Sequence, residues 1–256
     1  MRSARNSESK VEPKAKGNLS REELLRKAIE IDPEDGNAYY LLGCVLQAKG
    51  DLEGAELCFR RATEIDPENG AAHWRLGDFL RSKGDLDGAE LCFRRAIEID
   101  PNDSDTHSLL GDLLVSKGDL DGAELCCRRA IDIDPENGEA HSMLGFVLMA
   151  KNNLDGAELS FLRNIAINPD DSDAHHERGL VLMAKDDLCN AELSFRRAIK
   201  VDPKNGQAHC SLGRVLKNKG DLDGAELCFR RAIEIDQGDS IAHLCLERTL
   251  NAKGFL

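Results

Sequence analysis

The strongest constraint on this chain is a sequence repeat with a period of 34 residues. The seventeen letters "GDLDGAELCFRRAIEID" at residues 84–100 return unchanged at residues 220–236. Asp-Pro pairs mark the same period at 32–33, 66–67, 100–101, 134–135 and 202–203, with variants at 168–169 and 236–237. A fixed period of roughly 20 to 50 residues is typical of stacked structural units. We therefore expect one elongated domain built from copies of a single unit.

The first half of the unit at residues 70–103 has the spacing of a helix. Ala72, Leu76 and Leu80 recur every four residues, which places them on one helical face. Gly84 then follows a lysine, and a cation followed by glycine favours a helix C-terminus. The pattern predicts a first helix that buries one stripe and ends just before Gly84.

The second half of the unit predicts another helix. Asp85 is a suitable N-cap, and Pro101 ends the segment because proline cannot continue a helix. Glu90 stands four residues before Arg94, a spacing that pairs charges on an exposed helical face. The expected buried stripe of this helix consists of Leu86, Ala89, Phe93, Ala96 and Ile97. A single pair of such helices cannot bury its own apolar stripe, so neighbouring units must stack.

Small residues recur at one position of each helix. Glycine inside a helix costs about 1 kcal/mol relative to alanine, so its repetition indicates that a second helix packs closely there. Replacing Gly111 by leucine should therefore be worse than replacing it by alanine. The recurring residues are Gly43, Gly77, Gly111, Gly145, Gly179 and Gly213 in the first helix, and Ala55, Ala89, Ala123, Ala157, Ala191 and Ala225 in the second.

This unit resembles the tetratricopeptide repeat family. The matching marks are Leu76-Gly77 in the first helix, followed by Ala89, Phe93, Ala96 and Pro101 in and after the second. The resemblance implies an all-α, right-handed α-solenoid of tandem 34-residue helix-turn-helix repeats. It holds in six full units, at residues 36–69, 70–103, 104–137, 138–171, 172–205 and 206–239.

The remaining segments complete a predicted array over residues 19–256. Residues 19–35 resemble the second helix of an earlier unit, with Ser20 and Glu23 as a capping box. Residues 240–256 resemble a lone first helix that caps the array. Residues 1–18 contain five basic and two acidic residues and no Leu, Ile or Phe, so we expect a disordered basic arm.

The first helices vary on the side away from their buried stripe. The resemblance implies that these positions line a concave groove that holds an extended segment or a helix of a partner protein. Mixed charge there suggests a partner with an apolar, partly basic centre. Free drift of solvent-facing positions, or packing within the stack, is the alternative. The candidate groove residues are Tyr40, Trp74, Arg75, Asp78, Arg81, Phe146, Met149, His176, Glu177, Leu180, Met183, Arg214 and Lys217.

Histidine and cysteine also follow the repeat. A residue required once in each unit suggests packing, and no ligand partner lies at metal spacing, so we expect no metal site. The adjacent Cys126 and Cys127 could form a redox pair, although a packing role accounts for them as well. The repeated residues are His73, His107, His141, His175, His209 and His243, with Cys58, Cys92, Cys126 and Cys228.

Composition excludes several functional classes. The net charge of -13 argues against nucleic acid or an anionic membrane as a partner. No apolar run of about 18 residues and no secretory signal are present, so we expect a cytoplasmic protein, with organellar import left open. Nucleophile-elbow, phosphate-loop, zinc-protease and dinucleotide motifs are also missing. We therefore expect no enzymatic activity, cofactor or small-molecule substrate.

These observations favour a protein-interaction scaffold. One alternative is a regulatory or substrate-recognition subunit of an enzyme, such as a glycosyltransferase that carries these repeats. The asparagine ladder of those enzymes is absent, because the corresponding positions are Leu41, Arg75, Leu109, Met143, Glu177 and Ser211. Another alternative is a structural spacer. A clamp for acidic chaperone C-termini is disfavoured, since Tyr40 and Cys44 occupy the positions at which that clamp has Lys and Asn.

The third, fourth and fifth units depart from the common pattern. Departures can mark function or strain, and decay of a duplicated unit would produce them too. Cys127 replaces the aromatic residue of the third unit, which should leave a thinner core. The other departures are Asn152 and Asp186 in place of the cap glycine, Asn164 in place of a core alanine, Arg178 in place of leucine, and Cys189-Asn190.

Overall fold

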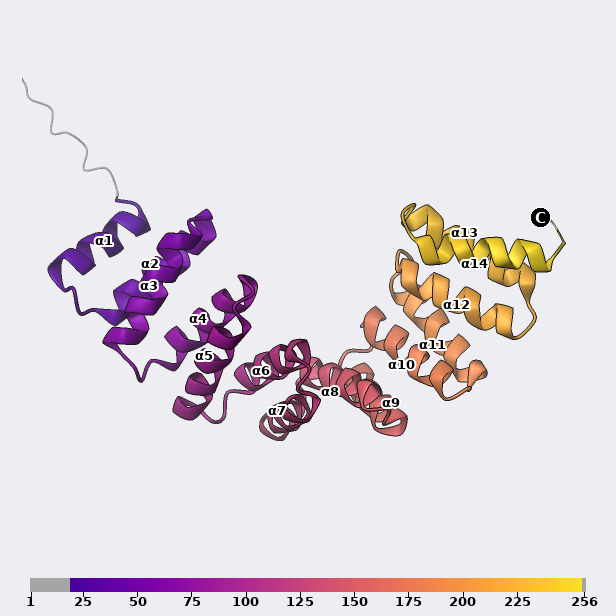
Figure 1. Cartoon of the computed structure of the whole chain (residues 1–256), viewed down its shortest axis with the longest axis horizontal. Helices are drawn as coiled ribbons and strands as arrows, with labels where there is room; N and C mark the ends of the chain where they lie inside the picture. Colours follow the sequence, from indigo (N-terminus) through magenta and orange to yellow (C-terminus); the bar gives the residue numbers. More distant parts are fainter. Residues whose placement is uncertain (1–18, 255–256) are drawn as a thin grey trace, which may run out of the picture. The chain divides into compact units, whose positions relative to one another are not determined.

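A computed structural model describes residues 19–254, and the regular structure within that range is entirely α-helical (Figure 1). Within the described residues the chain divides into two compact units, unit 1 ending at Ala72 and unit 2 beginning at His73, and the boundary lies inside a helix. We expected one elongated domain. In a stacked array each repeat contacts only its neighbours, so there is no central core that holds the whole chain together. A boundary between compact units therefore need not fall between two repeats. The predicted arm at residues 1–18 lies outside the described residues.

Unit 1 contains the opening helix and the first hairpin. Its helices are α1 (Arg21–Ile31), α2 (Gly36–Lys49) and α3 (Leu52–Ile65), followed by the start of α4 (Gly70–Ser82). The α2 and α3 helices pack side by side, and α1 packs on α2. The expected capping box is confirmed, because Ser20 accepts from the Glu23 N–H while the Glu23 carboxylate accepts from the Ser20 N–H.

Unit 2 contains five hairpins and a final helix. After most of α4 come α5 (Leu86–Ile99), α6 (Ser104–Lys117), α7 (Leu120–Ile133), α8 (Gly138–Ala150), α9 (Leu154–Ile167), α10 (Ser172–Ala184), α11 (Leu188–Val201), α12 (Gly206–Asn218), α13 (Leu222–Ile235) and α14 (Ser240–Ala252). We call the even-numbered helices A helices and the odd-numbered helices B helices. From α5 to α14 each helix packs on the next. Some A helices also contact the next A helix, for example α6 with α8 and α12 with α14.

Each B helix begins at a polar cap. The Asp85 carboxylate accepts from the Gly88 N–H at 3.0 Å, which confirms the predicted cap of α5. This bond satisfies one of the N–H groups that a helix leaves unpaired at its first turn. The same cap residue recurs as Asp51, Asp119, Asp187 and Asp221, with Asn153 in the fourth repeat.

The turn between the A and B helices requires a left-handed residue. Gly84 has φ +85°, and Gly50, Gly118 and Gly220 are similar. Two departures noted in the sequence occupy the same conformation, since Asn152 has φ 61° and Asp186 has φ 62°. Asn and Asp are the non-glycine residues that tolerate this region best. Both substitutions therefore keep the turn.

The repeated glycines of the A helices face the aromatic residues of the B helices. A Cβ on Gly145 would lie 2.7 Å from the Phe161 ring, and one on Gly179 would lie 2.5 Å from the Phe195 ring. Gly111 differs, because its nearest neighbour would be the Cys127 sulfur at 3.2 Å. Close helix packing thus explains the glycines, as the repeat pattern predicted.

Ion pairs connect successive hairpins at a lysine that the sequence pattern predicted only as a helix end. The Lys151 Nζ, at the end of α8, lies 2.5 Å from Asp121 and 2.7 Å from Glu124 on α7. Hydrogen bonds from Lys151, and then from Arg128, lower the pKa of Glu124. Equivalent lysines are Lys49, Lys117, Lys185, Lys219 and Lys253, each paired with a glutamate 27 residues earlier.

Candidate partner-binding surface

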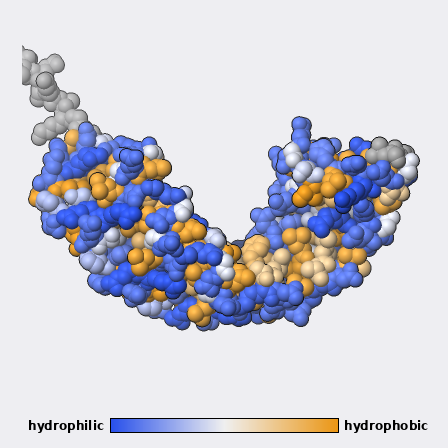
Figure 2. Space-filling model, viewed as in Figure 1, coloured by the Kyte–Doolittle hydropathy of each residue, from blue (hydrophilic) through white to orange (hydrophobic). Residues whose placement is uncertain are grey.

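Four apolar side chains lie on α8 and α10 where the sequence predicted a binding surface, and we call this set the apolar cluster. It consists of Phe146, Met149, Leu180 and Met183. Phe146 is 41% exposed, and its ring packs edge-on against Phe161 with 5.3 Å between centroids. The other three side chains are half-buried against the core. Figure 2 shows apolar surface gathered over this part of unit 2. Exposed apolar groups of this kind often mark interaction sites.

An acidic pocket of about 500 Å³ adjoins the apolar cluster, and Phe146 belongs to both. Its wall brings together α8, the end of α9, α10 and the start of α12, and includes four carboxyl groups. The lining residues are Glu139, Ser142, Phe146, Asn164, Asn168, Asp171, Asp173, Ala174, Glu177 and Gln207. Of the candidate residues predicted from sequence, the pocket therefore unites Phe146 with Glu177.

Asn164 forms the polar base of this acidic pocket. Its side chain is 2% exposed, and its amide donates to Ser142 Oγ at 2.6 Å and to Asp171 Oδ2 at 2.8 Å. The Asn164 carbonyl accepts from the Asn168 amide at 3.0 Å. A buried polar side chain needs such partners, because leaving it unpaired would cost about 1–3 kcal/mol. The substitution noted in the sequence is thus part of a complete hydrogen-bond network.

His176 lies inside the stack, whereas the sequence pattern predicted it on the variable side of its helix, away from the buried stripe. It is 5% exposed, and its ring lies 5.5 Å from the Phe195 ring. Its Nδ1 lies 3.2 Å from Glu177 Oε1 and its Nε2 lies 3.1 Å from Ser211 Oγ on α12. Ser108 and Cys210 at the equivalent positions are also buried. On α10 this position faces α12, and the contact with Ser211 explains the burial of His176.

Four candidate residues lie together on α4. The Arg75 guanidinium stands over the Trp74 ring, 4.6 Å from its centroid, which is cation–π geometry. Arg81 bridges Asp78 at 3.1 Å and Asp112 of α6 at 2.8 Å. These contacts hold the Arg75 and Arg81 side chains against the helices. A role in binding for all four residues stays a prediction.

The remaining candidates lie at other places. Tyr40 is in unit 1, half-buried, with its ring 6.5 Å from the Phe59 ring. On α12, Arg214 is exposed and Lys217 is half-buried. The structure does not bring these residues into the acidic pocket. Their part in binding also stays a prediction.

The repeated histidines have a structural contact in each repeat. His141 Nε2 lies 3.1 Å from the Pro135 carbonyl oxygen six residues earlier, so it donates to that oxygen. The bond ties the start of an A helix to the turn before it. The same bond is made by His107, His175, His209 and His243, the last to the Gln237 carbonyl. Within residues 19–254, no cluster of three or more His, Cys, Asp or Glu side chains could hold a metal ion.

The adjacent cysteines of α7 are protonated thiols at neutral pH. Cys127 is fully buried, and burial raises its pKa to about 12. Burial also raises the pKa of Cys126. Oxidation proceeds through the thiolate, so these environments disfavour a redox pair. Packing accounts for both side chains.

No helix in the described part of the chain is both long and apolar enough to cross a membrane.

The sequence did not predict the hydrogen-bond network of Asn164. Its partners lie 4, 7 and 22 residues away in the sequence, and only Asn168 has the spacing of neighbours on one helical face. The lysine pairs were detectable, since both partners recur every 34 residues.

Solved structures show the same fold. MamA is 28% identical, with a TM-score of 0.60, and the match covers 63% of this chain and 95% of MamA. The type IV pilus biogenesis factor PilW is 18% identical, with a TM-score of 0.72 and 82% and 98% coverage. A chain of the APC/C hetero-tetramer Cut9–Hcn1 is 15% identical, with a TM-score of 0.70 and 89% and 45% coverage, so this chain spans less than half of it. No curated protein sequence matches the chain.

Sequence models of known families match most of the described chain. Each matching model is described as a tetratricopeptide repeat, and the matches cover residues 40–104 and 176–240, 92–124, and 114–178. These ranges contain the glycine and phenylalanine contacts, the capped B helices and the left-handed turns described above. The chain belongs to the tetratricopeptide repeat family.

Proposed function

We propose that this chain is a non-catalytic protein-interaction scaffold that binds a segment of a partner protein along the A helices of unit 2. The observation that carries the proposal is the apolar cluster on α8 and α10 beside the acidic pocket, with Phe146 shared between them. Burial of the apolar surface favours binding of a partner segment, whereas the carboxylates favour a segment that carries positive charge. The two features lie side by side, so a single short segment could contact both.

The partner segment should combine an apolar side chain with a neighbouring lysine or arginine. Phe146 offers an exposed ring for apolar contact. Glu139, Asp173 and Glu177 line the pocket, where a cationic head could hydrogen-bond to a carboxylate. An acidic segment would meet repulsion at the same place. Nucleic acid, an anionic membrane and a small-molecule substrate are not proposed as ligands.

The compared proteins support the class of function. Cut9 and Hcn1 form a hetero-tetramer, so a chain of this fold assembles there with another protein. PilW is described as a pilus biogenesis factor. We infer the same general role, contact with another polypeptide, for this chain. Its particular ligand is inferred only from the chemistry of the acidic pocket and the apolar cluster.

Selection from a random peptide library tests this proposal. The full chain, immobilised in reducing buffer, is offered displayed peptides, and enriched sequences are then measured by fluorescence anisotropy. We expect enrichment of an apolar residue next to Lys or Arg, and binding that weakens with salt because exposed charges are screened. Absence of any enriched peptide would instead favour a structural spacer.

Matched variants locate the binding. We expect Phe146→Ser and Glu177→Gln each to weaken binding about tenfold, the effect of losing a well-placed contact. Leu244→Ser on α14 is the control, because Leu244 is 46% exposed but lies away from the acidic pocket. Trp74→Ala tests whether the groove predicted from sequence extends to α4. Enriched acidic peptides, or equal affinity for all variants, would contradict the proposal.

A further inference from the structure

A column of exposed leucines runs along the B helices of unit 2. Leu91 is 72% exposed and Leu125 is 71% exposed, although both belong to helices whose opposite faces form the core. The column consists of Leu91, Leu125, Leu159, Leu193 and Leu227, and none of them is less than 59% exposed. Packing within unit 2 does not account for these side chains. The same position nevertheless holds leucine in each of these repeats, including the fourth and fifth, which depart elsewhere.

Four of the five leucines stand between opposite charges on the surfaces of their helices. On α7, Asp121 precedes Leu125 by four residues and Arg129 follows it by four, which places all three on one face. Asp121 is 90% exposed although it also pairs with Lys151 of the same chain, and Arg129 is exposed as well. The same order recurs around Leu91, Leu159 and Leu227, but α11 has Cys189 in place of the aspartate.

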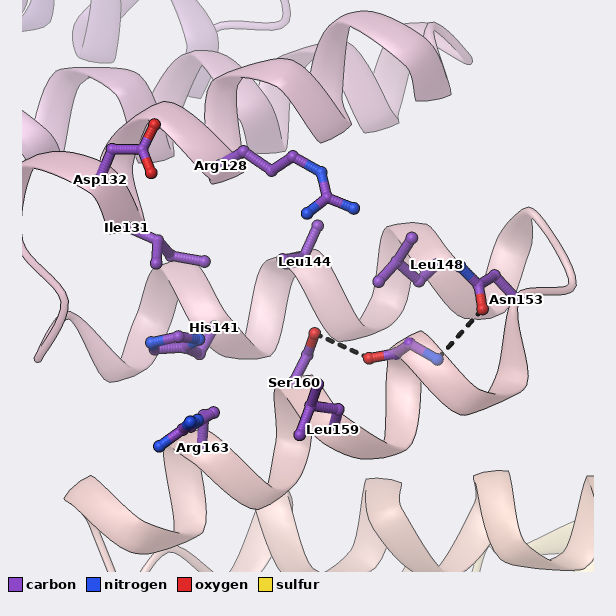
Figure 3. A pocket seen from close by; sticks show the side chains of 11 residues that line it. Arg128, Ile131, Asp132, His141, Leu144, Leu148, Asn153, Leu159, Ser160 and Arg163 are labelled. Atoms are coloured by element: carbon purple, nitrogen blue, oxygen red, sulfur yellow. Dashed lines mark hydrogen bonds between the residues drawn. The ribbon is translucent and has the colours of Figure 1, made fainter.

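Pockets separate successive B helices beside these leucines. One, of about 390 Å³, lies between α7 and α9 over α8 (Figure 3). In Figure 3, Ile131 belongs to one wall, Leu144 and Leu148 to the floor, and Leu159 to the other wall. Arg128, Asp132 and Arg163 stand around the opening. Further pockets of about 420 and 500 Å³ occupy the equivalent places between α5 and α7 and between α11 and α13.

We propose that unit 2 associates with a second copy of this chain through its B helices, with Leu125 of each copy entering the pocket between α7 and α9 of the other. The leucines recur once per repeat, and pockets lie beside them in three of the intervals between B helices. A second copy presents leucines with the same spacing as the pockets, so ridges and grooves match without any further adjustment. An unrelated partner would have to reproduce this spacing.

The charges favour the same occupant. In an antiparallel contact of α7 with a second α7 about Leu125, Arg129 of each copy faces Asp121 of the other. Each helix surface carries an acidic residue before the leucine and a basic residue after it. Two such helices that run in opposite directions therefore place the acidic residue of one opposite the basic residue of the other. A contact of this kind is isologous and closes as a dimer with two-fold symmetry.

This inference is independent of the proposed function. The pocket between α7 and α9 and the leucine column contain no residue of the apolar cluster or of the acidic pocket. A dimer formed here leaves the residues of the apolar cluster and of the acidic pocket accessible. Failure of peptide binding and failure of self-association would therefore be observed separately.

Sedimentation equilibrium of the full chain tests the inference. The chain is studied in reducing buffer at protein concentrations of roughly 1–200 µM. The salt concentration is about 0.15 M, at which charges are screened beyond about 8 Å. We expect reversible dimerisation, and Leu125→Ser with Leu159→Ser should weaken it at least about tenfold. Leu244→Ser on α14 should leave it unchanged. Because all these side chains are exposed, circular dichroism should show equal helicity.

A charge exchange tests the antiparallel geometry. Arg129→Asp alone should weaken the dimer, because it places like charges opposite each other. Adding Asp121→Arg together with Lys151→Met, which removes the cation that pairs with Asp121 inside the same chain, should restore association, because the two pairs between the copies then form again with their charges exchanged. A wild-type chain that stays monomeric over the whole range, a dimer insensitive to the leucine substitutions, or a second charge change that fails to rescue the first would each overturn the proposal.

Discussion

The third and fourth repeats, residues 104–137 and 138–171, each replace one core residue of the shared pattern, but the two replacements have different consequences. In the third repeat Cys127 stands where the other full repeats have phenylalanine, and it is fully buried. In the fourth repeat Asn164 stands where the others have alanine, and it is 2% exposed. Both helical hairpins keep the same pairing of helices.

The difference lies in what each replacement requires of its neighbours. The Cys127 thiol is an adaptable apolar group, and it needs only packing contacts. The Asn164 amide needs hydrogen-bond partners, which Ser142, Asp171 and Asn168 supply. Those partners also line the acidic pocket. A polar change in a core thus organises the surface near it, whereas an apolar change is absorbed locally.

The largest expected effect concerns the glycines that face these B helices. Gly145→Ala should destabilise unit 2 by about 2–3 kcal/mol, because the new Cβ would lie 2.7 Å from Phe161 and the core has to move. Gly111→Ala should change stability by less than about 1 kcal/mol, because the gain in helix propensity offsets the contact with Cys127 at 3.2 Å. Urea unfolding of the two variants measures the difference.

Two further variants sharpen this result. Gly111→Leu should be clearly worse than Gly111→Ala, since only one carbon atom fits beside Cys127. Combining Cys127→Phe with Gly111→Ala should destabilise unit 2 about as much as Gly145→Ala is expected to, because the new Cβ then faces an aromatic ring. Equal effects of alanine at both glycines would mean that the aromatic ring is not what demands glycine.

The second prediction removes the polar base of the fourth repeat. Asn164→Ala should cost about 1–2 kcal/mol, because Ser142 and Asp171 lose a buried donor. Thermal unfolding followed by circular dichroism measures this loss. The double variant Asn164→Ala with Ser142→Ala should recover part of it, since both members of the Asn164–Ser142 hydrogen bond are then apolar and only Asp171 and Asn168 lose a partner. No loss in the single variant would show that the network contributes nothing to stability.

The sequence predicted the helices of this fold well, because their determinants are local. Asp85 as a cap, Gly84 at the turn and the glycine opposite Phe93 all follow from neighbours in sequence or from the repeat itself. The tolerance of the turn for Asn152 and Asp186 also follows from local backbone preference.

The site was predicted less completely, because its residues depend on contacts between helices. His176 was placed on the outward side, but it packs against Ser211 of the next A helix. A single helix reveals its buried stripe, yet not which of its other sides meets a neighbouring repeat. The exposed leucine position was missed for the same reason, since leucine on a B helix resembles a core residue until Leu125 is seen at 71% exposure.

The third prediction uses the buried thiol to distinguish the repeats by pH. The folded-state pKa of Cys127 is raised to about 12 from an unfolded value of 9.0. Its contribution to stability is therefore fully present below pH 9 and is lost as the pH rises toward 12. Between pH 8 and pH 10, wild type should lose about 1 kcal/mol more than Cys127→Ala does. Urea unfolding at the two pH values measures the difference. The same pH dependence in both chains would exclude Cys127 as its source.

The smallest expected effect concerns Lys151, which joins the end of α8 in the fourth repeat to Asp121 and Glu124 of the third. Lys151→Met should lower the melting temperature less than any change above, because exposed ion pairs are weak and are screened by salt.

The dependence on pH has a definite sign for the same pair. Because Lys151 and then Arg128 lower the pKa of Glu124, the contribution of the pair is present above the unfolded carboxyl pKa of 4.5 and is lost as the pH falls. The melting temperatures of wild type and Lys151→Met should therefore differ most near neutral pH and converge near pH 3. Lys200→Met is the control, because Lys200 is exposed on α11 and makes no ion pair within residues 19–254. A Lys200 effect as large as that of Lys151 would assign the loss to net charge, and the two repeats would then be held together by their apolar contacts alone.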